Sequence, residues 1–304
     1  MSIFLAILTY FAYVFIVLMY GIKLAKYVRM PTHLRWELYP VIHEEKLSYG
    51  GSYLEERNWW EKARKKRPFK GFFSLLKDYF TLSDYARRNF LYWIGLYPWH
   101  IGFILIITFH ILCFFGAILI KWGIDVSPQS TDALGAFFYY LTLIAGVSSF
   151  VLGILGGIIV MLNRIFSRSL REFATRVNYF TYFFTIVVFF TGFYSWFFED
   201  PYLTEYRHFW VGLISLDFRD VSLWTKIHIV VFDLFLIYLP FTRSLHYVTR
   251  FLAFFLIRWD DEPNLTGGKL EEKIRAQLER DVSWSAPHII GKGKKWRELA
   301  GSNP

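Results

Sequence analysis

Five long runs with few or no charged residues limit most strongly what this chain can fold into. They lie at residues 1–22, 89–120, 133–163, 177–198 and 227–242. Only Asp233 interrupts the last of them. A helix needs about 20 apolar residues to cross roughly 30 Å of hydrocarbon, and a chain with 55% hydrophobic and 21% aromatic residues is too apolar for an ordinary soluble domain. The sequence therefore predicts an all-α, multi-pass membrane protein with five transmembrane helices.

The lysines and arginines predict how these helices are oriented. Segments 23–88, 164–176 and 243–304 hold 30 of the 34 basic residues. Basic residues accumulate on the cytoplasmic side of a membrane, so we expect the N-terminus outside and the C-terminus in the cytoplasm. The first run is expected to remain as an anchor, because no basic segment precedes it and "KLAKYVR" follows it directly. The net charge of +9 then reflects topology and anionic lipid, and no nucleic-acid partner is expected.

The cysteine content excludes several kinds of redox centre. Cys113 is the one cysteine of the chain. The chain therefore holds no internal disulfide, no cysteine-ligated iron-sulfur cluster of its own, and no C-x-x-C-H motif for covalent haem attachment. Gly-rich phosphate loops and H-E-x-x-H zinc motifs are also missing from the sequence. A redox cofactor in this chain must be held non-covalently by other side chains.

Four of the eight histidines lie in or at the edge of predicted spans. They are His100 and His110 in the second span, and His228 and His246 in or beyond the fifth. Polar side chains are costly in a membrane and need partners, so each is a candidate for function. Alternatively, a lone membrane histidine is a hydrogen-bond partner between helices. On one continuous helix, His228 and His246 would share a face about 27 Å apart, and His100 and His110 would lie about 15 Å apart.

The predicted topology pairs these histidines. The second span runs outward and the fifth runs inward, so His100 faces His246 near the cytoplasmic side and His110 faces His228 near the outer side. Zinc normally takes four protein or water ligands, whereas two imidazoles complete the axial positions of a haem iron. The sequence thus predicts two stacked bis-histidine haem sites. The unequal spacings require tilt or a kink at Pro240.

The joint spacing H-x9-H in the second span and H-x17-H in the fifth, with the ending "LPFTRSLH", resembles the gamma subunit of respiratory nitrate reductase and its relatives. The resemblance implies a subunit with two haem b groups that exchanges electrons between menaquinone or a related quinone and a cytoplasmic iron-sulfur subunit. By position, His100 and His246 match the ligands of the inner haem, and His110 and His228 those of the outer haem. The long segment 23–88 and the extended tail resemble the sulfur-metabolism branch, the membrane cytochromes of the DsrM and TmcC type.

That branch implies a partner similar to a heterodisulfide reductase, and other membrane or outer-face redox subunits are also possible partners. In the family, quinol chemistry is placed beside the outer haem. This makes Lys121 and Asp233 candidates for a quinone and proton site here. Lys121 is otherwise a headgroup anchor, and Asp233 is a packing partner for a neighbouring helix. Arg243 is a candidate to bind a haem propionate, or a basic residue that anchors the span at the inner surface.

The chain is accordingly divided into four parts. These are a first transmembrane helix at 1–22, a cytoplasmic loop with an amphipathic interfacial helix at 23–88, a haem-binding core of four membrane helices at 89–257, and a cytoplasmic tail at 258–304. Two other functions remain open at this stage: a proton-coupled transporter with intramembrane histidines, and a haem-free membrane anchor. A transporter is expected to show interrupted helices or an inverted repeat, and neither is evident.

Overall fold

A computed structural model of the chain describes residues 2–29, 57–58, 61, 68–242, 245–246, 249 and 266–301. This described part is helical, and its β-structure is limited to two isolated bridges, Asp281 with Lys295 and Ala286 with Ile289. The predicted all-α fold class is confirmed.

Five of the described helices are long and apolar enough to cross a membrane. They are α1 (Ser2–Val28), α4 (Phe90–Lys121), α5 (Ala133–Phe166), α7 (Arg176–Phe198) and α9 (Leu223–Tyr238), the last continued by the 3₁₀ helix η3 (Leu239–Phe241). Each overlaps one of the five apolar runs, so the prediction of five membrane-spanning helices is confirmed. The chain is a multi-pass membrane protein.

The helix that bears His228 does not run unbroken to His246, and it is interrupted at Pro240, where the sequence allowed for a kink. The α-helix α9 ends at Tyr238, and Leu239–Phe241 forms a 3₁₀ turn around Pro240. Thr242 then has an extended backbone, with φ −96° and ψ 177°. Proline lacks the N–H that an α-helix needs and its ring crowds the preceding turn, so the helix breaks here. The expected common face for the two histidines therefore does not follow from helix periodicity, and Arg243 lies outside the described residues.

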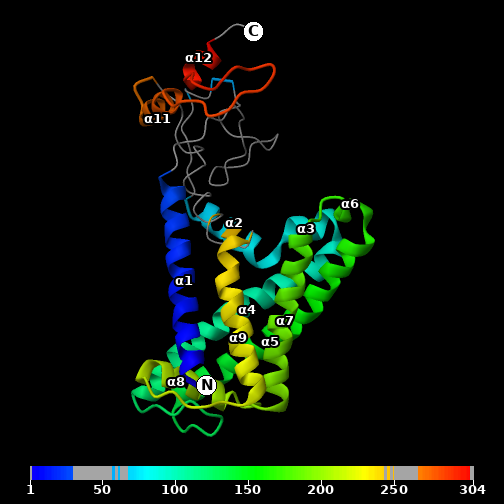
Figure 1. The fold of residues 1–304 in the computed structure, drawn as a ribbon, viewed down its shortest axis with the longest axis vertical. Helices are drawn as coiled ribbons and strands as arrows, with labels where there is room; N and C mark the ends of the chain where they lie inside the picture. Colours follow the sequence, from blue (N-terminus) through cyan, green and yellow to red (C-terminus); the bar gives the residue numbers. More distant parts are fainter. Residues whose placement is uncertain are drawn as a thin grey trace. The chain divides into compact units, whose positions relative to one another are not determined.

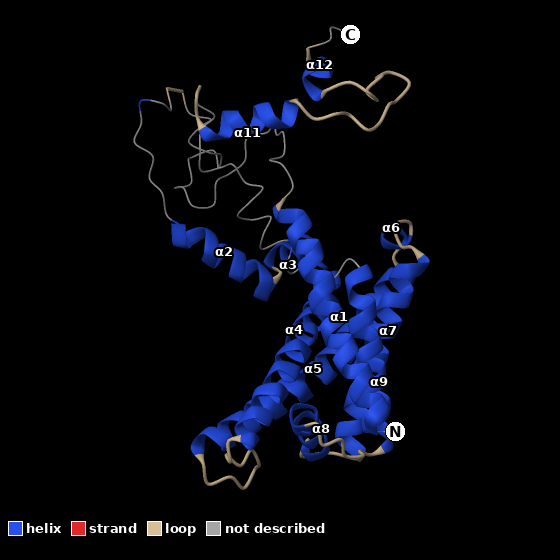
Figure 2. Ribbon diagram, turned by 60° about the vertical axis from the view of Figure 1, so that its left-hand side comes forward, coloured by secondary structure: helices blue, strands red, loops and turns tan. Residues whose placement is uncertain are grey.

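The chain divides into two compact units. One comprises residues 1–20 and 77–244, and the other residues 21–76 and 245–304. The first unit contains nearly all of the membrane helices and is called the bundle below. Figures 1 and 2 show α4, α5, α7 and α9 side by side in it.

Glycines let α4 and α5 approach each other closely. A Cβ added at Gly102 of α4 would lie 2.6 Å from the backbone nitrogen of Gly153 of α5. One added at Gly156 would lie 2.2 Å from the backbone nitrogen of Trp99. Both distances are far shorter than any real carbon contact, so only glycine fits where these backbones cross. Small residues serve this purpose between membrane helices generally, because lipid gives no hydrophobic advantage to burying larger ones.

One end of the bundle is closed by the short helix α8 (Thr204–Ser215), which lies there with the N-terminus of α1 (Figure 1). Asp200 starts α8 by accepting from the backbone N–H groups of Thr204 (2.6 Å) and Tyr206 (3.0 Å). Glu199 accepts from Trp224 N at 2.7 Å and so caps the first turn of α9. Carboxylates stabilise helix N-termini through these free N–H groups and the helix dipole. This end is called the α8 end.

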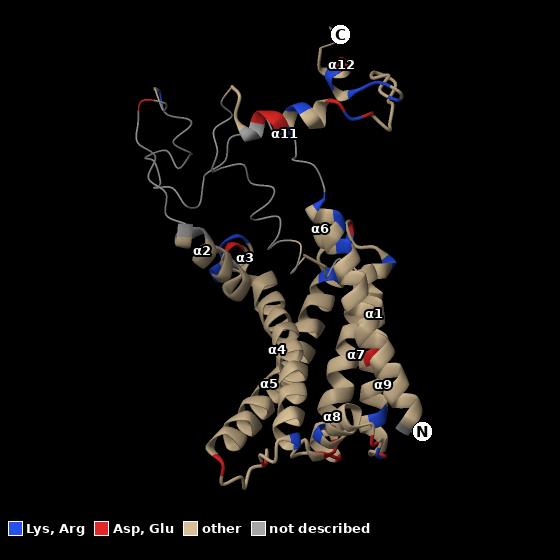
Figure 3. Ribbon diagram, turned by 90° about the vertical axis from the view of Figure 1, so that its left-hand side faces the viewer, with Lys and Arg blue, Asp and Glu red and all other residues tan. Residues whose placement is uncertain are grey.

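The opposite end of the bundle carries the short helix α6 (Arg168–Arg171) and is called the α6 end. Figure 3 shows that the long stretches of the membrane helices carry few charges and that lysines and arginines gather near α6 and α3 (Ser83–Arg88). The charged residues thus mark the two boundaries expected for a membrane-embedded bundle.

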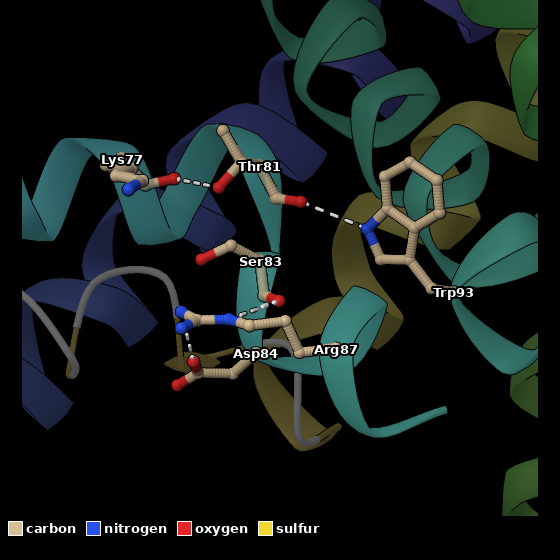
Figure 4. Close-up of polar contacts among 6 residues, drawn as sticks. All are labelled: Lys77, Thr81, Ser83, Asp84, Arg87 and Trp93. Atoms are coloured by element: carbon tan, nitrogen blue, oxygen red, sulfur yellow. Dashed lines mark hydrogen bonds and ion pairs between the residues drawn. The ribbon is translucent and has the colours of Figure 1, made fainter. Parts of the chain in front are cut away.

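The entry to α4 is fixed by local hydrogen bonds, which Figure 4 shows in close-up. The indole Nε1 of Trp93 donates to the carbonyl of Thr81 at 3.0 Å, which ties α4 to the end of α2 (Pro68–Thr81). Arg87 pairs with Asp84 at 3.0 Å within α3. The exposed phenylalanines of α2, Phe69, Phe73 and Phe80, form the apolar part of the amphipathic segment predicted within 23–88.

The described tail contains α11 (Lys269–Leu278) and α12 (Trp296–Ala300). Val282 is buried between them, and Glu279 pairs with Lys295 (2.7 Å) and Arg297 (2.9 Å). The hydrogen bond from Lys295 lowers the pKa of Glu279 below its usual value. The tail therefore has a small fold of its own.

Candidate functional site

His110 of α4 and His228 of α9 lie together inside the bundle. Their side chains are 4% and 3% exposed, respectively. Their ring centroids are 6.4 Å apart and the ring planes are inclined by 36°. The sequence predicted this pair from the opposite directions of the two helices, and the structure brings these two residues together.

The Nδ1 atom of His110 lies 2.7 Å from the carbonyl oxygen of Ile106, one turn earlier in α4. A carbonyl oxygen can only accept a hydrogen bond, so Nδ1 carries the proton and donates it. In the neutral ring, Nε2 is then the nitrogen with the free lone pair. The helix itself thus fixes both the tautomer and the ring orientation of His110.

His228 is held in the same tautomer by α7. The hydroxyl of Thr191 donates to the carbonyl of Val188 at 3.0 Å, and its oxygen lies 3.2 Å from Nδ1 of His228. Because the single hydroxyl proton is already used, the threonine oxygen accepts from the Nδ1–H group. The Nε2 atom of His228 therefore also keeps its lone pair.

Both Nε2 atoms are buried and have no hydrogen-bond partner among the described residues. Two such nitrogens in an apolar interior would be costly unless something else binds them. Two imidazoles that each bind one metal at about 2 Å place their ring centres roughly 6 Å apart, which agrees with the 6.4 Å observed here. Metal-binding histidines generally donate their other N–H to a carbonyl or similar acceptor, as both do here. The pair fits the axial ligand set of a haem.

Aromatic rings surround the histidine pair. Phe232 stacks on His110 with centroids 3.7 Å apart and an angle of 3°. Tyr206 of α8 is 5.8 Å from His110 and 6.1 Å from His228, centroid to centroid. A Cβ added at Gly192 would lie 2.8 Å from Cε1 of His228, so glycine is needed there for the ring to fit. The surroundings of the two imidazoles are therefore buried and apolar, as is typical where a hydrophobic cofactor binds.

Asp233 follows Phe232 and is 1% exposed. Its carboxyl oxygen accepts from the hydroxyl of Thr9 of α1 at 2.6 Å. One turn along α1, the ring of Tyr13 packs edge-on against Trp210 of α8, with centroids 5.4 Å apart. The Tyr13 hydroxyl is buried without a hydrogen-bond partner among the described residues. One hydroxyl donor and one carboxyl group therefore lie near the His110–His228 pair without a full set of protein partners.

The other predicted site residues lie elsewhere. His100 is half-buried in α4, and His246 is exposed beyond the break at Pro240. Lys121 is exposed at the last position of α4. Arg243 lies outside the described residues. The pairing of His100 with His246 and the roles of Lys121 and Arg243 therefore stay predictions.

Sequence reasoning missed three residues of this site: Thr191, Gly192 and Tyr206. Thr191 and Gly192 are adjacent polar and small residues inside an apolar span, a signal that was available in the sequence. Tyr206 lies in an aromatic-rich stretch of the kind typical of a membrane interface, whereas it is 6% exposed and contacts both histidines.

The part of the chain that is described contains no group of three or more histidine, cysteine, aspartate or glutamate side chains that could hold a metal ion. The candidate centre there thus offers two protein ligands.

A comparison with protein families matches the nitrate reductase gamma subunit model over residues 81–260, which is more than half of the chain. The chain belongs to the nitrate reductase gamma subunit family. No curated protein matched it.

Members of the nitrate reductase gamma subunit family are membrane haem b subunits of respiratory complexes. They function in electron transport together with catalytic and iron-sulfur subunits in a membrane complex. The matched residues include α4, α5, α7 and α9 and therefore both histidines of the buried pair.

Proposed function

We propose that this chain is a di-haem b subunit that transfers electrons between a membrane quinone, menaquinone or a relative, and a cytoplasmic iron-sulfur subunit. One observation supports this most strongly: His110 and His228 are fixed in the tautomer that leaves both Nε2 lone pairs free in the protein interior.

His110 and His228 would hold one haem through these Nε2 atoms, and His100 and His246 would hold the second. When bound, haem b supplies one-electron transfer at its iron. The protein's part is to hold the two imidazoles in place: Ile106 and Thr191 fix the rings, and the surrounding aromatic side chains exclude water. A site fixed in this way needs little rearrangement when the charge changes.

The α6 end of the bundle faces the cytoplasm and the α8 end faces outward in this proposal. The basic residues of segments 164–176 and 23–88 support it, because positive charge is retained on the cytoplasmic side. His110 and His228 then serve the outer haem, and the iron-sulfur partner meets the inner one. The long segment 23–88 and the tail 258–304 favour the sulfur-metabolism branch, with a heterodisulfide reductase-like partner and room for other membrane or outer-face redox subunits.

Quinone reacts beside the outer haem in this proposal. Asp233 can hold or release a proton at its carboxyl group as the quinone changes charge. The Tyr13 hydroxyl, which has no hydrogen-bond partner among the described residues, can donate a hydrogen bond to a quinone oxygen. Lys121 belongs to the proposed site through its position at the end of the helix that bears His110.

The haem content of the purified chain tests the proposal. We expect two haem b per chain by pyridine haemochrome assay, with low-spin bis-histidine spectra. One haem per chain, or none, would contradict it, and none would favour the haem-free anchor.

The quinone site is tested separately in variants that keep both haems. We expect Asp233→Asn to slow the reduction of the haems by a quinol analogue about 10²-fold or more, as loss of a proton-transfer group does. Lys121→Ala is measured alongside. Unchanged rates in both variants would remove these residues from the mechanism.

A further inference from the structure

Arg207 of α8 is a buried arginine that forms no ion pair within the described part of the chain. Its side chain is 4% exposed, although it lies in the short helix that closes the α8 end. Arginine is rarely buried unless it is paired, because moving a guanidinium out of water is costly.

The surroundings of Arg207 satisfy only part of its guanidinium group. Nη2 donates to the carbonyl of Tyr202, and the guanidinium carbon lies 4.9 Å from the ring centre of Tyr139 of α5. Nη1 is buried and has no hydrogen-bond partner in the described part of the chain. One face of the group is thus packed, and one donor remains without an acceptor.

Asp200 and Asp125 are near enough to act on the charge of Arg207, but neither forms an ion pair with it. Asp200 uses its two oxygens to accept from the backbone N–H groups of Thr204 and Tyr206. Among the ion pairs of the described residues, none includes Arg207. Burial lowers the pKa of Arg207 although the charges of Asp200 and Asp125 act in the opposite direction. Its buried Nη1 therefore still lacks an acceptor, which a further anion could supply.

The position of Arg207 indicates which anion this is. Tyr206, the preceding residue, contacts both His110 and His228. Arg207 also interacts electrostatically with Cys113, one turn beyond His110 in α4. Arg207 therefore directly follows a residue that contacts both histidines of the proposed haem site, in the helix that closes the α8 end. A haem carries two propionate carboxylates at its edge, and guanidinium groups bind carboxylates through paired N–H donors.

We propose that Arg207 binds a propionate of the haem held by His110 and His228 and sets the potential of that haem. This inference rests on the proposed haem site. A fixed positive charge beside the haem stabilises the reduced, more negative state. Arg207 is thus a positioning and tuning residue for one of the two haems.

Redox titration of the purified, haem-loaded chain, without partner subunits or quinone, tests the proposal. We expect Arg207→Gln to shift the reduction equilibrium of the haem held by His110 and His228 at least tenfold towards the ferric form, which is about 59 mV for one electron. Arg207→Lys should keep most of the wild-type potential, and the other haem should not change in either variant. Arg219→Gln is the matched control, since Arg219 is exposed and paired with Asp217 at 3.1 Å.

A second measurement covers the case in which Arg207→Gln does not retain the haem. Haem labelled with ¹³C in its propionates should give a carboxylate infrared band that moves between the wild-type chain and Arg207→Lys. If two haems are bound and neither the potential nor this band changes, the inference is wrong while the proposed function stands. A potential shift that appears only when a partner subunit is added would also overturn it, because the anion would then belong to the partner. Absence of haem from the wild-type chain would instead refute the proposed function.

Discussion

The two predicted histidine pairs differ in how their backbone is built. His110 and His228 each lie inside a regular α-helix of the bundle, and both rings are buried and oriented by a hydrogen bond at Nδ1. His100 also lies within α4, but His246 follows the break at Pro240 and is exposed. Helix geometry therefore predicts where His110 and His228 lie, whereas it no longer predicts the position of His246 beyond the break at Pro240. A helical register can be extended only as far as the backbone hydrogen bonds continue.

The largest effect is expected from replacing the histidines themselves, which tests directly whether the two pairs hold separate haems. Alanine at His110 or His228 should remove the same haem and reduce the haem content from two to one per chain, because the site would lose one of the two imidazoles that hold this haem. Alanine at His100 or His246 should remove the other haem. Redox titration of the four variants identifies which haem is lost. If His100→Ala and His228→Ala lost the same haem, the antiparallel pairing would be wrong.

A smaller effect is expected from Gly192→Ala, which should disturb the His110–His228 site alone. The added Cβ would lie 2.5 Å from Cε1 of Phe150 and 2.8 Å from Cε1 of His228. Overpacking of this kind costs about 1–3 kcal/mol, which corresponds to roughly 5–150-fold weaker retention of that haem. Haem release during dilution, followed by absorbance, measures it.

Gly116→Ala in α4 is the control for this variant, because its added Cβ would be 4.0 Å from the nearest atom. Equal haem loss in both variants would show that the effect is a general one on the helices and does not arise at His228.

The smallest effect is expected from Thr191→Val, which keeps the shape of the side chain and removes the hydroxyl that accepts from Nδ1 of His228. Loss of such a supporting hydrogen bond typically weakens metal binding about 10-fold or somewhat more. We expect weaker retention of this haem and an altered low-spin electron paramagnetic resonance signal, with the other haem unchanged. Thr185→Val, whose hydroxyl donates to the Thr181 carbonyl at 2.7 Å, is the matched control. Identical signals in Thr191→Val and the wild-type chain would exclude a role for this hydroxyl.

The sequence by itself determined the membrane class, the five spans and the two histidines that meet in the bundle. Uncharged runs of sufficient length have few other stable structures, because a helix satisfies its own backbone hydrogen bonds in lipid. The opposite directions of α4 and α9 follow from counting spans, and the meeting of His110 with His228 follows from those directions.

Only the tertiary structure decided which residues from distant parts of the chain complete the site. Thr9 lies 224 positions from Asp233, and no local pattern predicts that its hydroxyl satisfies that carboxyl group. Likewise, α8 turns back into the bundle, so that Tyr206 contacts the histidines and Arg207 is buried, although the same aromatic residues are typical of a membrane interface. The physical reason is that periodicity and hydropathy report a residue's preference for lipid or water along its own helix. Which groups satisfy one another's hydrogen bonds and charges depends on side chains that come from distant parts of the chain.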